Sequence, residues 1–451
     1  MERLATLLQR FSSRPTRAAW VLAVPLALGV APQETPPTPT PQVIIPNGAR
    51  QHFAIPECIP KGADAASREA CHTFSQVLKA DLQFEDMFEF VPDGLLQAIP
   101  SQNPDSPNLK DYQSIGATYL VMTRAEATGT EMSVEVKVYF CPSGQSVVAK
   151  RYSGKADNPR LFAHQASDDI FATLTPVKGV ARSKVAFVSD RDATKDKRTK
   201  EIYIMDYDGF NPRRVTVNRS LNILPAWSPD GKTLAYVSYR LGIPDIFLAS
   251  IYEGKSSNLT NGKGTQAFAP AWSPDGTKIA FQSNRSGNTE IWIANADGSG
   301  AHKITGSAGA NLAPCWSPTG QEIAFTSSRS GGPQIYVMDS EGLNVRRVST
   351  IGNWNDAPAW NPKYPEIAYT SRLDAGLEVA IVDLGNHQVR QITEGRGNCE
   401  YPAWAPNGRH LMFACNSRGG NWQITVSDRD GRVVKALPAG PGSNTQPDWG
   451  L

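Results

Sequence analysis

A tryptophan recurs through the second half of the chain at an almost constant spacing. Six tryptophans follow one another at steps of 45, 44, 44, 44 and 45 residues, and each has a proline two residues before it. The six are Trp227, Trp272, Trp316, Trp360, Trp404 and Trp449. A self-similar period of this length is typical of a repeat architecture, so it constrains the fold more than any single residue does.

One period contains four short segments with the pattern of strands. After Trp272 come the turn SPDG, the segment KIAFQS, the turn NRSGNT, the segment EIWIAN, the turn ADGSG and the segment AHKIT. Apolar and polar residues alternate in the middle segments, as half-buried strands require. Four short antiparallel strands in one such period predict one blade of a β-propeller.

The two ends of the repeat complete each other. Trp449 stands two residues from the end of the sequence with no strand after it, whereas residues 184–216 supply three strands with no Trp strand before them. Pairing these fragments closes the ring and removes open sheet edges. Five full blades and this composite blade predict a six-bladed β-propeller over residues 178–451.

The region before the propeller has a mixed pattern. Residues 53–58, 118–124 and 132–140 read as strands, and residues 63–82 read as a helix. Asn158-Pro159 is a helix-start signal, and the residues after it repeat an apolar side chain every four positions. We therefore expect an all-β six-bladed propeller preceded by a smaller α/β domain over residues 42–177.

The first residues predict export. Arginines precede an apolar run from Ala18 to Ala31 that is too short to span a bilayer, which is the layout of a secretory signal peptide over residues 1–31. Cleavage after Gly29 and cleavage after Ala31 both fit. Residues 32–41 are rich in proline and predict an extended tether. No later segment is long and apolar enough to span a membrane.

Charge and cysteine usage narrow the class of protein. The chain has 45 basic and 43 acidic residues, a net charge of +2, and no basic stripe of the kind that nucleic-acid binding needs. None of the six cysteines lies in a CxxC motif. Cys399 and Cys415 flank the Asn407-Gly408 turn almost symmetrically, which predicts a disulfide across a hairpin in an oxidising compartment. Two reduced, buried thiols are the alternative.

The sequence lacks the usual motifs of catalysis. It contains no G-x-S-x-G and no H-E-x-x-H, and its GKT and GKS triplets lack the leading glycine of a phosphate-binding loop. The Asp-x-Asp-Gly triplets recur at strand turns and lack the glutamate at the twelfth position of a calcium loop. We therefore expect a protein without catalytic residues, metal or cofactor.

An arginine ends the second strand of every blade. The six arginines are Arg191, Arg240, Arg285, Arg329, Arg372 and Arg418. A Glu, Asp or Gln opens the third strand shortly after each of them. One hypothesis is a ring of cations on one face of the propeller, and the other, which we favour, is an arginine that bonds within its own hairpin.

The loops that lead into the Trp strands are candidates for binding a partner. Alternate turns of a blade emerge on the same side, so these loops are expected to surround one mouth of the central channel. They carry a nonuniform set of polar and apolar side chains: Asn222, Gln266, Phe268, Asn311, Asn355, Asp356, Glu400 and Asn444. Such a mixture suits recognition of a protein. The alternative is that each residue only caps its own turn.

These motifs, taken with the order of the domains, resemble the TolB family of the Tol–Pal system of Gram-negative bacteria. The resemblance runs from about residue 50 to the end of the chain. It rests on DYQSIGATYLVMTR, AHQASDDIFATLT, VAFVSDR, the W-SPDG blade pattern and the closing NTQPDWG. An α/β domain ahead of a six-bladed ring is more specific than the blade pattern alone.

The resemblance implies a non-catalytic, monomeric periplasmic protein that links a Pal-like peptidoglycan-associated lipoprotein to inner-membrane Tol proteins. Such a protein supports outer-membrane integrity and invagination at division. The family's lipoprotein site falls on the loops described above and adds Leu312 to them. Gln266 and Leu312 stand where the family uses His and Thr. The mature N-terminus would bind TolA, although the segment between Pro41 and Arg50 is short and has no acidic residue.

Two other classes of protein are alternatives. A secreted propeller hydrolase or lyase would need histidines or carboxylates that converge on the channel, and the repeat does not supply them. A carbohydrate-binding propeller would use Trp292, Trp354 and Trp422 as stacking surfaces, but only Trp354 lies in a loop that leads into a Trp strand.

Overall fold

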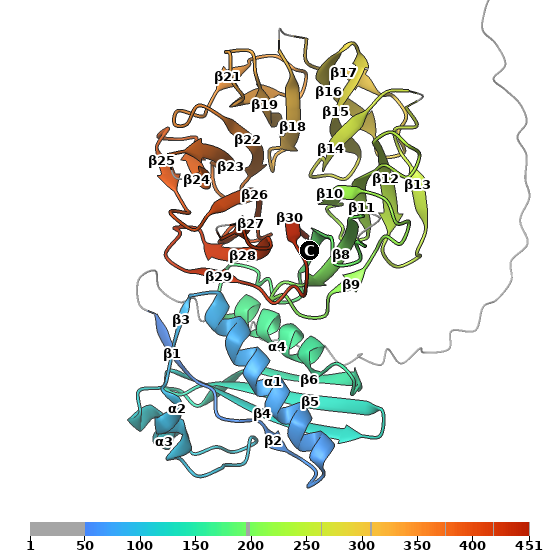
Figure 1. Ribbon diagram of the computed structural model, residues 1–451. Helices are drawn as coiled ribbons and strands as arrows, with labels where there is room; N and C mark the ends of the chain where they lie inside the picture. The colour runs from blue at the N-terminus through green and yellow to red at the C-terminus, as the bar shows by residue number, and fades with distance from the viewer. Residues whose placement is uncertain are drawn as a thin grey trace, which may run out of the picture. The chain divides into compact units, whose positions relative to one another are not determined.

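The computed structural model of the chain describes residues 50–194, 199–262, 264–306, 309–374, 376–417 and 419–450 (Figure 1). The predicted signal peptide, the predicted tether and Arg418 lie outside the described residues.

Each full tryptophan period folds into a four-stranded antiparallel sheet, as predicted. The first two such sheets contain β10 (Asn222–Trp227), β11 (Thr233–Ser238), β12 (Asp245–Ser250) and β13 (Ser256–Asn258), and β14 (Ala267–Trp272), β15 (Lys278–Ser286), β16 (Asn288–Asn295) and β17 (His302–Lys303). The next contains β18 (Asn311–Trp316), β19 (Glu322–Ser327), β20 (Gln334–Asp339) and β21 (Arg346–Arg347). The last two contain β22 (Asn355–Trp360), β23 (Glu366–Leu373), β24 (Gly376–Asp383) and β25 (Val389–Gln391), and β26 (Asn398–Trp404), β27 (His410–Asn416), β28 (Gln423–Asp428) and β29 (Val434–Ala436).

The remaining sheet joins distant parts of the chain. Its order is β30 (Asn444–Gly450), β7 (Lys184–Ser189), β8 (Glu201–Asp206) and β9 (Arg213–Arg214). Strand β30 runs antiparallel to β7, with Trp449 opposite Val185. In Figure 1 the red strand β30 lies beside the green strands, and the Trp strands surround the centre of the ring. The predicted closure and the six blades are confirmed.

The repeated tryptophan fastens one blade to the next. Three indole Nε1 atoms donate to a backbone carbonyl of the preceding blade at 3.1–3.2 Å: Trp272 to Ala226, Trp316 to Ala271 and Trp404 to Ala359. Apolar clusters also cross the blade boundaries. Val188 of β7, for example, packs in one buried cluster with Leu234 and Tyr236 of β11. The blades are therefore stabilised by burial between neighbours as well as by their own strand pairing.

The α/β domain is built on a mixed sheet. Its strands are β1 (Gln51–Ala54), β2 (Ile59–Pro60), β3 (Phe88–Phe90), β4 (Tyr119–Thr128), β5 (Glu131–Phe140) and β6 (Gln145–Lys155). The order is β3-β1-β4-β5-β6, with β1 parallel to β3 and β4, and β4 to β6 antiparallel; β2 pairs in parallel with β4.

Helices cover both faces of this sheet. Helices α1 (Ala65–Phe84) and α4 (Pro159–Leu174) pack against each other (Figure 1), and their buried residues form one core with alternate residues of β4 and β5. The short helices α2 (Asp93–Gln97) and α3 (Leu109–Ser114) contribute Leu96 and Tyr112 to a second cluster, which contains Leu120 of β4. As predicted, Asn158 caps α4, because its side chain accepts a hydrogen bond from the Leu161 amide.

Some elements differ from the sequence prediction. The strand expected at residues 53–58 is β1, which ends at Ala54; Pro56 has no amide hydrogen to extend a strand ladder. Helices α2 and α3 and strands β3 and β6 were not predicted. Strand β6 escapes a pattern search because most of its residues are exposed on both faces.

Two disulfides join neighbouring elements. Cys399 and Cys415 lie directly opposite each other on β26 and β27 and are bonded, which confirms the predicted pair. The Cys58–Cys71 disulfide, which links the segment before β2 to α1, was not predicted. The two thiols that remain are Cys141, which is buried, and Cys315.

The α/β domain and the propeller belong to one compact unit. At the end of α1, Phe84 stacks on His410 with 4.0 Å between the ring centroids, and Arg409 donates to the Glu85 carbonyl oxygen at 2.8 Å. The predicted domain boundary at residue 177 falls between α4 and β7. Among the helices of the described residues, none combines the length and the apolar character that crossing a membrane requires.

Candidate partner-binding face

The strand register brings the predicted loops together on one face. Asn222 at the start of β10 lies opposite Ser238 at the end of β11, and Ser238 lies opposite Asp245 at the start of β12. The same register recurs in the blades that begin at Asn311 and Asn355. The loops leading into the Trp strands and the loops between second and third strands therefore emerge on the same side. We call this side, defined by the residues that precede and open the six Trp strands, the loop surface.

Four predicted contact residues open Trp strands but are buried beneath the loop surface. Asn222, Asn311 and Asn355 are fully buried, and Asn444 is 2% exposed. A partner has no access to these side chains, so their assignment as partner contacts is wrong. They occupy the first position of a Trp strand, five residues before its tryptophan, and this position points into the junction between blades. Ala267 and Cys399 hold the same position in the other two blades.

Three of these asparagines bridge two blades. Each Nδ2 donates to the side chain that opens the third strand of the preceding blade: Asn222 to Glu201 at 3.0 Å, Asn311 to Glu290 at 2.8 Å and Asn355 to Gln334 at 2.8 Å. The Oδ1 atoms of Asn222 and Asn311 each accept from a serine of their own second strand at 2.7 Å. A hydroxyl two residues after the fourth strand donates to the same acidic or amide side chain, from Thr216, Thr305 and Ser349. We call these hydrogen bonds the interblade network.

The fourth asparagine has a related role. Asn444 accepts from Arg191 at 3.0 Å and donates to the Gly440 carbonyl oxygen at 3.0 Å. It therefore holds the loop that leads into β30. This is the turn-capping alternative considered for these residues.

Five predicted contact residues do reach the surface. Gln266 is exposed, and Phe268, Leu312, Asp356 and Glu400 are partly exposed. The last four each stand four residues before the tryptophan of four successive Trp strands, β14, β18, β22 and β26. Because side chains of a strand alternate between its two sides, this position points away from the interblade network. The four blades thus contribute these side chains to one mouth of the central channel.

The accessible residues divide into an apolar and an acidic sector. Phe268 packs edge-on against Tyr239 with ring centroids 6.2 Å apart, and Leu312 follows on the next blade. Asp356 accepts from Thr326 at 2.8 Å, and burial raises its pKa. Burial and the neighbouring charge of Asp356 both raise the pKa of Glu400. The mouth therefore presents apolar groups beside two carboxylates whose charge is costly to bury without a partner.

Below the mouth, the channel is lined by a ring of strained backbone. The residue three positions before each Trp has a positive φ between 44° and 58°: Leu224, Ala269, Ala313, Ala357, Tyr401 and Gln446. With the prolines that follow them, these residues line a cavity of about 130 Å³. Side chains fix this backbone, since Gln446 accepts from the Leu224 amide and Gln282 from the Ala313 amide, both at 2.9 Å. The repeated proline was the only signal for this ring in the sequence.

The arginines of the second strands bond within their own blades. Arg240 lies over the ring of Phe247 at 3.8 Å, and Arg329 lies over that of Tyr336 at 4.9 Å. Arg329 also donates to Ser327 at 2.9 Å. Among the described residues, none of these arginines forms an ion pair with an acid that opens a third strand. For the described arginines the predicted intrablade role is correct, and their partners are hydroxyls, aromatic rings, asparagine side-chain oxygens and a backbone carbonyl.

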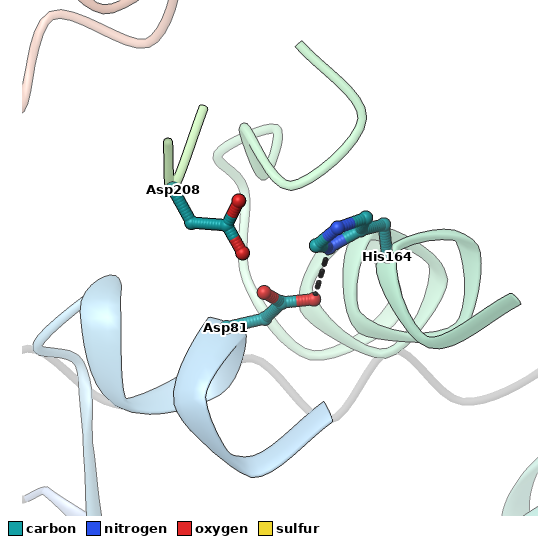
Figure 2. A group of neighbouring side chains, drawn as sticks. All are labelled: Asp81, His164 and Asp208. Carbon is teal, nitrogen blue, oxygen red and sulfur yellow. Dashed lines mark hydrogen bonds and ion pairs between the residues drawn. The ribbon is translucent and has the colours of Figure 1, made fainter. Parts of the chain in front are cut away.

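Away from the loop surface, one cluster has residue types that could hold a metal ion. Asp81, His164 and Asp208 approach one another closely (Figure 2). However, His164 Nδ1 lies 2.8 Å from Asp81 Oδ2, and Asp208 is paired with the Arg160 guanidinium. Because an added cation would be repelled by Arg160, we do not assign these residues as ligands.

Comparison with known families covers both domains. The model of the "TolB amino-terminal domain" matches residues 42–147, and that of the "TolB beta propeller domain" matches residues 171–451.

Several curated relatives are named Tol-Pal system protein TolB. The Tol-Pal system protein TolB of Desulfosudis oleivorans is 34% identical over 148 residues, or 33% of each chain. That of Geobacter sulfurreducens is 35% identical over 173 residues, or 38% of each chain. The chain aligns with between 33% and 48% of the length of the first three curated relatives.

A solved structure extends the likeness to nearly the whole chain. The crystal structure of TolB from Acinetobacter baumannii is 27% identical, with a TM-score of 0.75, and the superposition covers 89% of this chain and 97% of the other. The names of the curated relatives designate a component of the Tol-Pal system. Because the two family models together span both domains, the chain belongs to the TolB family.

Proposed function

We propose that this protein is the periplasmic propeller component of a Tol–Pal system and that its loop surface binds a Pal-like peptidoglycan-associated lipoprotein. Family membership supports the system, and the arrangement of Phe268, Leu312, Asp356 and Glu400 supports the surface. Four successive blades present these residues around one mouth, so a partner that contacts all of them must span several blades, as a protein can.

The two sectors of the mouth suggest how a lipoprotein binds. Phe268 is the largest apolar side chain of these four, so it is the proposed anchor. Glu400 and Asp356 would accept hydrogen bonds from donors of the partner, which would offset the cost of burying their charges. Since few residues of an interface carry most of the affinity, loss of the Phe268 ring is expected to cost about 2 kcal/mol, roughly a 30-fold loss of affinity.

Calorimetry with the soluble domain of the cognate lipoprotein tests the surface. We expect Phe268→Ala and Glu400→Lys each to weaken binding. Tyr252→Ala is the matched control, because Tyr252 is 78% exposed in the turn between β12 and β13, away from the loop surface. Thermal melting of each variant separates lost contacts from lost folding. Unchanged affinity in both loop-surface variants would place the lipoprotein elsewhere.

The family resemblance implies a second contact in the same system, made through the N-terminal segment. We propose that the signal peptide is removed on export and that the mature N-terminus binds the inner-membrane protein TolA. Mass spectrometry of the protein from the periplasmic fraction would give the cleavage site. Deleting residues 42–49 should abolish binding to the periplasmic part of TolA and leave lipoprotein binding unchanged. Equal TolA binding by the deleted protein would refute this part of the proposal.

We also propose that the boundary between the α/β domain and the propeller lies between residues 177 and 178. The monomeric state can be examined by light scattering, and this boundary by limited proteolysis.

A further inference from the structure

A buried group of charged residues lies where the α/β domain meets the first strands of the propeller. Asp81 of α1 and His164 of α4 come from the α/β domain, and Asp206 and Asp208 lie at and just after the end of β8. Figure 2 shows Asp81, His164 and Asp208 directed toward one another from three separate segments. The side chains of Asp81 and His164 are 0% and 2% exposed, and that of Asp206 is 8% exposed.

The hydrogen bonds leave one nitrogen of the histidine without a partner. His164 Nδ1 lies 2.8 Å from Asp81 Oδ2, and the Tyr207 hydroxyl donates to Asp81 Oδ1 at 2.7 Å. His164 Nε2 is buried and has no hydrogen-bond partner among the described residues, but it lies 4.0 Å from Asp206 Oδ2. In a neutral imidazole that donates through Nδ1, Nε2 would be a buried, unsatisfied acceptor facing a carboxylate. A second proton on Nε2 would remove this conflict.

The charges around the imidazole also favour a second proton on His164 Nε2. The groups that face it are Asp81 from α1, Tyr207 and Asp208 from the turn after β8, Asp206 from β8, Arg160 from α4 and Lys184 from β7. Lys184 pairs with Asp206 and Arg160 with Asp208, so the Asp81 carboxylate, whose pKa is raised by burial, has no counter-charge while His164 is neutral. A positively charged His164 imidazolium balances the remaining carboxylate charge. A divalent metal would instead add two charges beside two cations already in place.

We propose that His164 is doubly protonated in the assembled protein and that this proton fastens the α/β domain to the propeller. Neutralising His164 leaves a buried negative charge shared by both domains, which weakens the contact between them. The proposal goes beyond partner binding, because it concerns how the two domains stay together.

Electrostatics at the same interface support this direction. Burial lowers the pKa of His164, but Asp81, Asp208 and Asp206 together outweigh burial and raise it. A histidine with a raised pKa stabilises the folded state below its ordinary value of 6.5, and the stabilisation is lost as pH rises through the raised value.

Two further titratable groups at this interface must be considered. Glu85 accepts from the Val180 amide at 3.0 Å and from Asn407 at 3.1 Å, with Arg409 nearby, and burial raises its pKa to about 7. Its protonation also favours the contact at lower pH. Burial lowers the pKa of His410 to about 4, so His410 acts in the opposite direction as pH falls below 6.5. A variant of His164 alone is needed to isolate its share.

Histidine resonances of the full mature chain provide the direct test. With six histidines in the chain, His164→Gln assigns the His164 resonance by its loss. His72→Gln, at an exposed position of the same helix α1 that carries Asp81, is the matched control. We expect His164 to titrate above 6.5. The thermal midpoint of the wild type should exceed that of His164→Gln at low pH, and the difference should shrink as pH rises through the His164 titration, whereas His72→Gln should follow the wild type.

A second variant covers the case in which His164→Gln fails to fold. Asp206→Asn removes the carboxylate that faces Nε2 and should move the His164 titration to lower pH. A His164 resonance that titrates below 6.5, or a stability difference that does not change with pH, would overturn the proposal. Stoichiometric binding of zinc chloride in calorimetry, lost in His164→Gln but kept in His72→Gln, would also overturn it, because Nε2 would then be a metal ligand.

Discussion

The interblade network makes a sharp prediction for Asn311. Replacing Asn311 with alanine removes the donor to Glu290 at 2.8 Å and the acceptor of Ser327 at 2.7 Å. The backbone should tolerate the change, because Ala267 holds the same position in the neighbouring blade. The perturbation is therefore the loss of hydrogen bonds, and not a change of strand geometry.

The expected cost follows from what the variant leaves behind. Glu290 is 3% exposed and keeps the Thr305 hydroxyl as donor, but it loses the Asn311 amide. A hydrogen bond to a charged group is worth about 1.5–3 kcal/mol, and the Ser327 hydroxyl adds about 1 kcal/mol. We expect Asn311→Ala to lower the free energy of unfolding by about 3 kcal/mol. For a domain of this size that corresponds to a fall of about 5 °C in the melting temperature.

Calorimetric melting of a matched set tests the reasoning. Glu290→Gln should cost little, since Gln334 fills the same place in the next blade and accepts from Asn355 at 2.8 Å. If a stranded carboxylate causes the loss, the double variant Asn311→Ala/Glu290→Gln should melt above Asn311→Ala. Asn353→Ala, at an exposed position of a nearby loop, controls for a general effect. An Asn311→Ala protein that melts within 1 °C of the wild type would refute the role of the network.

Three other predictions concern the propeller. Replacing Cys399 and Cys415 together by serine should lower the denaturation midpoint by the equivalent of about 3 kcal/mol, because the disulfide closes a loop of moderate length; an unchanged midpoint would contradict this. Deleting residues 443–451 removes β30 with its buried Trp449, a loss of more than about 3 kcal/mol for the indole alone, so calorimetry should show no cooperative transition at the wild-type temperature. Burial raises the pKa of Asp448 from its ordinary 3.8 to about 6, so ionisation of Asp448 destabilises the fold as pH rises from 3.8 to 6. Asp448→Asn should flatten this part of the profile of melting temperature against pH. Parallel profiles for the wild type and the variant would refute the prediction.

The architecture was predictable because each blade repeats the same local signals. The tryptophan period, the SPDG-type turns and the alternating strands all depend on residues close together in the sequence. Ring closure also followed, since the unpaired Trp449 strand and the three strands after Lys184 each lacked what the other supplied. Strand β6 was not predicted because most of its residues are exposed. The helices α2 and α3 were not predicted because they are too short to show a clear period.

The partner-binding residues were only partly predictable, and the reason is geometric. Asn311 and Leu312 are adjacent in the chain, yet the first is buried between blades and the second reaches the mouth. A strand reverses the direction of its side chains at every residue, so the choice between the two depends on where the strand begins. The sequence placed both residues in a loop before a proline, where neither has a fixed direction. Only pairing with Ser327 and Thr326 on β19 sets the register that separates them.

The interdomain group marks the other limit of prediction. Asp81 and His164 are 83 residues apart, and Tyr207 lies a further 43 residues along the chain. His164 lies in the segment AHQASDDIFATLT and Tyr207 in an Asp-x-Asp-Gly turn, but neither pattern indicates which residues will contact the histidine. What distinguishes His164 is a set of carboxylates that only the packing of α1 and α4 against the end of β8 brings together. Under the proposal made above, a rise of pH through the His164 titration weakens the contact between the two domains.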